Sequence, residues 1–218
     1  MAQVLILQGG WPGHRPEEFG DFAVNHLFQE DHVVQSSDLR ILESHTLADF
    51  DLVVPIWTYG ELTQDQEQAL VNAVSNGLGF VAWHGAASAF LLNRLHKFML
   101  GGQFVAHPGG NLTTFTVQFL DNDPLVDGLC DITLTSEQYY LLVDPAVKVL
   151  AVTEFKGSDM AWIEGVRMPV AWKRQWGKGR VFYCSLGHTV EILKEPSITA
   201  LMKRAVQWAA RSPQTCAR

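Results

Sequence analysis

The stretch Gly79-Phe80-Val81-Ala82-Trp83-His84-Gly85 decides the fold, because an apolar run ends in it abruptly at a histidine and a glycine. A short continuous apolar run is typical of a strand that is covered on both faces, as in a parallel sheet. The change of character at His84 predicts that the strand stops there and that a helix N-terminus opens. The free amide groups of such a terminus favour an anion or a polarised oxygen.

The alternation of strand and helix extends upstream. A helix is predicted from Pro16, since proline is tolerated at the first helical position. A second helix is predicted after Thr63, which forms a capping box with Gln66, and it is expected to stop at Gly77. This β-α-β-α order implies right-handed crossovers and a mostly parallel sheet with helices on both faces. Strands are predicted at residues 4–7, 32–35, 52–57 and 79–83.

The second half of the chain is richer in strands. Phe115, Val117 and Phe119 alternate with polar residues, which indicates a strand with one solvent-exposed face and hence an antiparallel excursion. A last helix is predicted to begin at the cap Ser197 and to turn Trp208 toward the core. We expect a single domain over residues 1–211 and a disordered tail over residues 212–218. Further strands are predicted at residues 112–119, 132–135, 147–155, 169–172 and 180–185.

Composition and charge exclude several classes of protein. A hydrophobic fraction of 47% over 218 residues excludes a disordered chain. The first residues lack the basic region and the cleavage site of a signal peptide. A net charge of −7 argues against nucleic-acid binding. Three scattered cysteines, Cys130, Cys184 and Cys216, argue against a disulfide framework and favour a reducing cytoplasm. We therefore expect a small-molecule partner, neither nucleic acid nor membrane, with a homo-oligomer left open.

The candidate functional residues follow the predicted strands, where ligands sit in an open α/β sheet. His84 ends a strand directly, and His188 follows another through Leu186-Gly187. Residues 100–108 deliver His107 just before a strand. The side chains expected to converge are those of His14, Trp57, His84, His107, Glu137, Tyr139, Trp172 and His188.

The other notable residues receive structural interpretations. Residues 177–180, Gly-Lys-Gly-Arg, lack the spacing of a phosphate-binding loop and are interpreted as a hairpin turn. Cys184 is interpreted as a buried structural thiol, since nothing marks it as activated. Four histidines are interpreted as surface or hydrogen-bonded residues, the first of them on the inner face of its helix: His26, His32, His45 and His96.

Five motifs occur in a fixed order along the chain: Gly79-Phe80-Val81-Ala82-Trp83-His84, Leu100-Gly101-Gly102-Gln103-Phe104-Val105-Ala106-His107-Pro108, Met168-Pro169-Val170-Ala171-Trp172, Trp176-Gly177-Lys178-Gly179-Arg180-Val181-Phe182-Tyr183 and Ser185-Leu186-Gly187-His188. Together they resemble the ThuA-like (trehalose-utilisation) family, and the resemblance extends from the first strand to Trp208. It implies a flavodoxin-like fold related to class I glutamine amidotransferases, and a connection to disaccharide or keto-sugar catabolism.

Amidotransferase activity itself is rejected. Those enzymes need a cysteine nucleophile at the sharp strand-to-helix turn, with a histidine to activate it. This chain has His84 at that turn and no cysteine nearby, so the covalent intermediate cannot form. A shared fold does not carry the activity with it.

Two functional hypotheses remain. The first is an enzyme that acts on a disaccharide or keto-sugar by isomerisation or hydrolysis, with His84, His107, Glu137 and His188 as acid–base residues. In that hypothesis the substrate contacts His14, Trp57, Tyr139 and Trp172. A metal-assisted variant places a divalent ion such as zinc on the same four acid–base residues, although none of the short spacings of a zinc site is present. The second hypothesis is a non-catalytic sugar-binding subunit that works beside an oxidoreductase.

Overall fold

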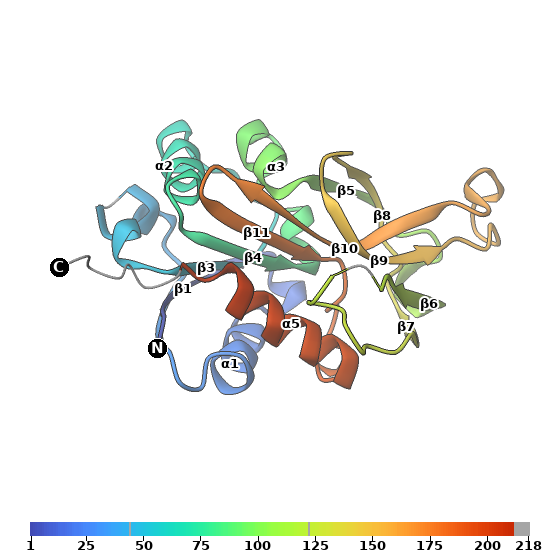
Figure 1. The fold of residues 1–218 in the computed structure, drawn as a ribbon. Coiled ribbons are helices and arrows are strands. Elements are labelled where there is room, and N and C mark those ends of the chain that lie inside the picture. The colour runs from blue at the N-terminus through green and yellow to red at the C-terminus, as the bar shows by residue number, and fades with distance from the viewer. Residues whose placement is uncertain (44, 122, 212–218) are drawn as a thin grey trace.

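The computed structural model describes residues 1–43, 45–121 and 123–211. Its main feature is a nine-stranded mixed sheet in the order β2-β1-β3-β4-β11-β10-β9-β6-β7 (Figure 1). The first five strands in this order are parallel and the other four are added antiparallel. The strands of this sheet are β1 (Gln3–Gly10), β2 (His32–Ser36), β3 (Leu52–Thr58), β4 (Gly79–Trp83), β6 (Thr113–Phe119), β7 (Ile132–Ser136), β9 (Lys148–Glu154), β10 (Arg167–Trp176) and β11 (Gly179–Cys184).

The parallel half confirms the strands predicted from apolar runs. β4 spans Gly79–Trp83 and is buried along its whole length, and β3 is buried at all but one of its positions. Their side chains are apolar on both faces because helices cover both faces of this half. The α/β fold class predicted from the sequence is confirmed, and the order β2-β1-β3-β4 is that of a flavodoxin-like sheet.

Helices α1 (Pro16–His26) and α5 (Pro196–Ala209) lie on one face of the sheet, and α2 (Gln64–Ser75) and α3 (Arg94–Leu100) lie on the other (Figure 1). A short helix, α4 (Val190–Leu193), precedes α5. The capping box of Thr63 and Gln66 is present at the start of α2, as predicted. None of the helices in the described ranges is long and apolar enough to cross a membrane.

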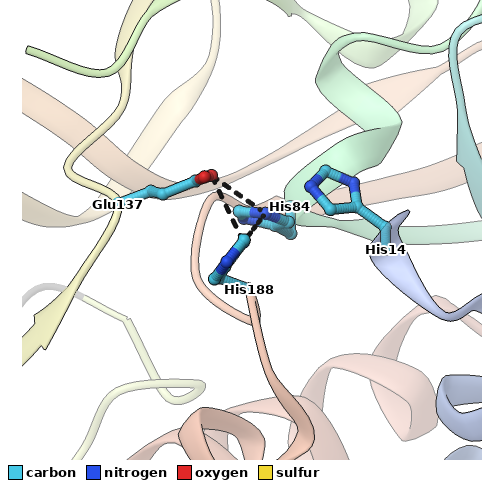
Figure 2. A group of neighbouring side chains, drawn as sticks. All are labelled: His14, His84, Glu137 and His188. Atoms are coloured by element: carbon cyan, nitrogen blue, oxygen red, sulfur yellow. Dashed lines mark hydrogen bonds and ion pairs between the residues drawn. The ribbon is translucent and has the colours of Figure 1, made fainter. Parts of the chain in front are cut away.

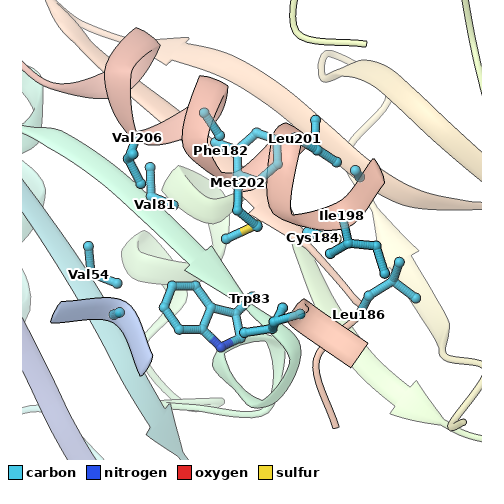
Figure 3. Close-up of a cluster of buried hydrophobic side chains, with 14 of the residues drawn as sticks. Val54, Val81, Trp83, Phe182, Cys184, Leu186, Ile198, Leu201, Met202 and Val206 are labelled. Atoms are coloured by element: carbon cyan, nitrogen blue, oxygen red, sulfur yellow. The ribbon is translucent and has the colours of Figure 1, made fainter. Parts of the chain in front are cut away.

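The core beneath α5 positions the strands that carry the site. Met202 and Val206 of the helix pack against Val81 of β4 and Phe182 of β11 (Figure 3). All four side chains are at most 5% exposed. Burial of each such side chain contributes about 1.5–3 kcal/mol, so the carboxyl ends of β4 and β11 are held rigidly side by side.

The antiparallel half contains a second, two-stranded sheet that the sequence did not predict. Strand β5 (Gly102–Ala106) pairs with β8 (Tyr140–Val143). The sequence placed His107 before a strand, whereas it directly follows β5. The hairpin between β10 and β11 turns at Gly177, as predicted.

Several local predictions are corrected by the structure. The turn after β4 is a short 3₁₀ helix, η4 (His84–Ala87), and not the start of an α-helix. The last helix is capped by Glu195, whose carboxylate accepts the Ile198 amide, while Ser197 donates to the Cys130 carbonyl instead. His26 is exposed rather than on an inner face. The tail predicted over residues 212–218 lies outside the described residues.

Candidate functional site

His84 lies at the carboxyl end of β4 with a backbone conformation that is rare for a non-glycine residue. Its φ is +42°, in the left-handed region, which costs energy for a residue with a Cβ. The Tyr183 hydroxyl donates to the His84 carbonyl at 2.9 Å and holds this conformation in place. The side chain is buried, with 3% of the residue exposed. The strained backbone therefore aims a buried imidazole at the edge of the sheet where parallel strands end.

Both ring nitrogens of His84 have partners. Nδ1 is 3.1 Å from the Ser185 carbonyl oxygen, which can only accept, so Nδ1 carries a proton and donates. Nε2 is 3.0 Å from the Tyr139 hydroxyl, and the two rings stack at 4.7 Å. This arrangement directs Nε2 toward the side chains that converge on it.

Glu137, between β7 and β8, is the acidic centre of the site. Its Oε2 lies 3.3 Å from Nε2 of His84 and 3.4 Å from Nδ1 of His188. Figure 2 marks these contacts with dashed lines. Its Oε1 lies 3.9 Å from Nε2 of His107. Burial by itself would raise the pKa of Glu137, but the hydrogen bond from His84 and the neighbouring imidazoles lower it to about 2. The carboxylate is therefore ionised at neutral pH.

His188 and His14 complete the cluster from two other strand ends. His188 follows β11 through Gly187, whose φ of +109° needs a glycine, and its Nδ1 lies 3.3 Å from Nε2 of His84. His14 ends the 3₁₀ turn η1 (Pro12–His14), and its Nδ1 hydrogen-bonds Thr58 Oγ1 at 2.8 Å. Burial and nearby imidazoles lower the pKa of His14 to about 4, and burial lowers that of His188, so burial favours neutral rings.

The structure brings together most of the residues predicted from the sequence. One potential ligand atom from each of His14, His84, Glu137 and His188 lies within 4.8 Å of the others. Tyr139 contacts His84, and His107 borders Glu137 with 40% of its side chain exposed. These positions are consistent with a shared role, and the catalytic and binding roles themselves stay predictions.

The two predicted tryptophans differ. Trp57 lines a hollow beside His14 and His84, and its ring packs beneath Gly9. Trp172 is fully buried in the core, where its indole N–H donates to the Leu100 carbonyl at 2.8 Å. The prediction that Trp172 contacts a ligand is therefore wrong for this structure.

Sequence reasoning missed Lys97, a buried cation on α3 that supports the turn. Its Nζ donates to the carbonyl oxygens of Ala86 at 3.1 Å and Ala87 at 3.0 Å, at the end of η4. Burial lowers the pKa of Lys97 to about 7. The available signal was a lysine directly before the apolar run Phe98-Met99-Leu100 of the same helix, which indicates a partly buried position.

A larger hollow, of about 570 Å³, lies at the opposite end of the strands. It is lined by Met1, Asp31 and Asp51 at the sheet edge and by Lys203 and Arg211. Ligands of open α/β sheets bind beyond the carboxyl ends of the strands, which here is the end that carries the four-residue cluster. We therefore place the candidate site at His84 and not at the larger hollow.

The fold and the site define the class: an α/β protein whose parallel strands end at a buried carboxylate surrounded by imidazoles. The family model described as trehalose utilisation (ThuA) matches residues 3–209, and the chain belongs to this family. Membership connects the chain with carbohydrate catabolism. The sequence has no match among curated proteins.

Solved structures agree on the fold. A putative ThuA-like protein from Parabacteroides merdae superposes with a TM-score of 0.78 at 16% identity, over 95% of this chain and 89% of that one. A putative ThuA-like protein from Bacteroides uniformis gives 0.77 at 18% identity, with the same coverage. A cold-adapted β-galactosidase from Rahnella sp. R3 gives 0.60 at 15% identity, over 95% of this chain but 31% of the longer enzyme. At these identities the likeness concerns the fold alone.

Proposed function

We propose that this chain is an enzyme of carbohydrate catabolism that moves protons on a disaccharide or keto-sugar at the cluster around Glu137. The observation that carries the proposal is the carboxylate itself: one of its oxygens faces His188 and the other faces His107, at 3.4 Å and 3.9 Å. Two imidazoles on the two sides of one anion can accept and donate protons in turn, because the anion stabilises whichever ring becomes charged.

The accessible histidines are the ones suited to touch a substrate. The side chains of His107 and His188 are 40% and 22% exposed, whereas His84 is buried beneath them. A proton beside the carbonyl of a keto-sugar is comparatively acidic, so a neutral imidazole suffices to remove it. In this proposal His107 and His188 exchange protons with the sugar, and His84 and Tyr139 orient the carboxylate.

An aromatic edge beside the cluster supports a sugar ligand. Trp11 and Tyr59 are 45% and 54% exposed, and their ring centres are 6.1 Å apart. The Trp11 ring also lies 4.8 Å from that of His14. Tyr59 keeps a left-handed backbone with φ of +62°, held by the Phe90 amide that donates to its carbonyl. Flat apolar rings at a polar site suit the C–H faces of a sugar.

We also propose a cytoplasmic location for this activity. The described cysteines, Cys130 and Cys184, are free thiols. Cys184 is fully buried, and burial raises the pKa of its thiol to about 12, so this thiol stays inert. Free thiols persist in a reducing compartment.

The experiment is proton exchange in D₂O, followed by NMR, with trehalose, other disaccharides and their keto forms. We expect the wild-type protein to exchange or convert a keto-sugar. His107→Ala and Glu137→Gln should slow this by about 10²–10⁴-fold, the usual contribution of an acid–base group. Sugar binding, measured by calorimetry, should persist in both variants.

A sugar-binding subunit that partners an oxidoreductase gives a different result. The wild-type protein would then bind the sugar without exchange or turnover anywhere in the panel, and that outcome would refute the proposed enzyme. Trp11→Ala is the matched variant for binding, since it removes one ring of the aromatic edge and leaves Glu137, His107 and His188 with their contacts. We expect about a tenfold loss of affinity from it, the size of one aromatic contact.

A further inference from the structure

The contact between His84 and Glu137 indicates that this cluster can bind a cation. Nδ1 of His84 donates to the Ser185 carbonyl, so Nε2 is the ring nitrogen that faces the cluster. This nitrogen lies 3.3 Å from a carboxylate oxygen of Glu137 and 3.0 Å from the Tyr139 hydroxyl. In the described ranges, the ion-pair partners of Glu137 are histidines and not lysine or arginine. An anionic carboxylate with imidazole nitrogens on it and no described lysine or arginine beside it is the kind of site that a cation, a proton or a metal ion, can occupy.

Three of the ligand atoms form a nearly equilateral triangle. Nε2 of His84 is 3.3 Å from Nδ1 of His188 and 3.3 Å from Oε2 of Glu137, and the last two atoms are 3.4 Å apart. Zinc ligands of these types lie at about 2.0–2.1 Å, and tetrahedral geometry then separates neighbouring ligand atoms by about 3.3–3.4 Å. The observed triangle has the size of one face of a metal tetrahedron.

The surroundings also resemble those of metal-binding histidines. A ligating histidine usually donates its second N–H to a carbonyl or carboxylate, which fixes the tautomer. His84 does so to Ser185. His14 is held through Nδ1 by Thr58, which leaves Nε2 as its free nitrogen at the edge of the cluster. Two histidines and one carboxylate with a fourth position open is a set that catalytic zinc and non-haem iron sites use.

We propose that His84, Glu137 and His188 bind one divalent transition-metal ion, with His14 beside the open fourth position. The inference deepens the proposed function, on which its catalytic meaning rests, by naming a cofactor for the same site. With the ion bound, His188 serves as a ligand instead of exchanging protons with the sugar, so His107 keeps that role alone. A bound ion in such a site polarises a carbonyl oxygen and lowers the pKa of water.

The test is zinc binding to the chelator-treated full-length protein, measured by calorimetry with ZnCl₂. We expect one ion per chain, and at least about 100-fold weaker binding for Glu137→Gln and His188→Ala, since each removes a ligand while second-shell changes alone cost 10–100-fold. Cobalt(II) substitution should give the visible absorption of a four-coordinate site in the wild-type protein and lose it in both variants.

Two matched controls separate this site from general histidine binding. His26→Ala removes an exposed histidine on α1, and His107→Ala removes the neighbour of Glu137 that is outside the proposed ligand set. His26→Ala should bind zinc within about threefold of the wild type, and His107→Ala should lose about tenfold, the lower end of a second-shell change. Substoichiometric zinc in the wild-type protein, or equal losses in His107→Ala and His188→Ala, would overturn the proposed ligand set.

The metal and the enzyme can fail separately. No zinc binding by a protein that exchanges protons fully would reject the metal site and leave the proposed function standing. Stoichiometric zinc in a protein that converts no sugar would reject the proposed function and leave the metal site standing. Circular dichroism of each variant, with a wild-type spectrum expected, shows that a loss of zinc is not a loss of fold.

Discussion

The turn η4 and the helix α3 that packs against it each bury a histidine, and they treat it in opposite ways. His84 in the turn is 3% exposed and has a partner for both ring nitrogens. His96 in the helix is 1% exposed, and neither of its ring nitrogens has a hydrogen-bond partner among the described residues. A buried polar group without a partner costs about 1–3 kcal/mol. The comparison suggests that the bonded network around His84 is positioned for chemistry, while His96 serves as packing.

The two regions are connected through Lys97. This side chain comes from α3, next to His96, and donates to the two carbonyls at the end of η4. The helix therefore supplies the donors that the short turn cannot provide for itself. Substitutions on either side of this connection can show whether the difference between the two regions is functional.

Among the substitutions that compare these two regions, Gly85→Ala in the turn is expected to have the largest effect. A Cβ at this position would overlap Oγ1 of Thr58 and Nδ1 of His14, the two atoms whose hydrogen bond places the His14 ring. We expect a loss of about 100-fold in turnover, since a displacement of 1 Å near a reacting centre has this size. Overpacking should also lower the free energy of unfolding by about 1–3 kcal/mol.

The control for this substitution is Gly20→Ala in α1. The atoms nearest to a Cβ there belong to the flexible ends of Gln8 and Gln35, which can move aside. Turnover and thermal denaturation are measured for both variants and compared with those of the wild type. Wild-type turnover in Gly85→Ala would mean that the position of His14 does not affect catalysis. The geometry of the turn would then have no functional role.

The second effect concerns the connection itself, through the pH dependence of stability. Burial lowers the pKa of Lys97 to about 7, whereas in the unfolded chain a lysine titrates near ~10.4. Between these values the unfolded state binds more protons, so this group makes the free energy of unfolding rise with pH. We expect Lys97→Met to remove a rise of about 2 kcal/mol between pH 7.5 and 9.5, within the limit of ~1.4 kcal/mol per pH unit.

Urea denaturation at the two pH values measures this difference. The exposed Lys178→Met is the control, and its pH dependence should match that of the wild type. Equal slopes for the wild type and Lys97→Met would show that Lys97 is not desolvated as the structure implies. The helix would then support the turn by packing alone.

The fold was largely predictable because most strands and helices of its parallel half have local, periodic sequence signals. The buried runs of β1, β3 and β4 and the capping box of α2 each have a short-range signal. The pair β5–β8 could not be predicted in this way. Its strands have four or five residues, are partly exposed, and pair across more than thirty positions of sequence. Their pairing depends on the tertiary structure and not on a local pattern.

The site was predictable where it depended on strand ends. His84 directly follows β4, His188 follows β11 through Leu186 and Gly187, and the parallel arrangement of these strands brings the two histidines together. The role of Trp172 was mistaken because the strand predicted to end at this residue continues to Trp176, which places Trp172 inside β10. When buried, its indole N–H needs an acceptor, and the Leu100 carbonyl at the end of α3 provides it. Leu100 is distant from Trp172 in the sequence, so no local pattern predicts this contact. The missing partners of His96 have no sequence signal at all.

The smallest effect, and the most direct test of the contrast between the regions, is His96→Leu. The ring of His96 lies edge-on to Phe80 and Phe90, at 5.9 Å and 5.3 Å between ring centres, and burial keeps its pKa well below the usual range. Leucine places an apolar side chain of similar size among these rings and removes two unpaired nitrogens. We expect the free energy of unfolding to rise by about 1 kcal/mol.

His84→Leu, the same change in the turn, should lower the free energy of unfolding, since it leaves the Ser185 carbonyl and the Tyr139 hydroxyl without their partner. Denaturant titration of the two variants measures both values. A destabilised His96→Leu would mean that the His96 nitrogens are satisfied by ordered water, and the two regions would then bury their histidines for the same reason.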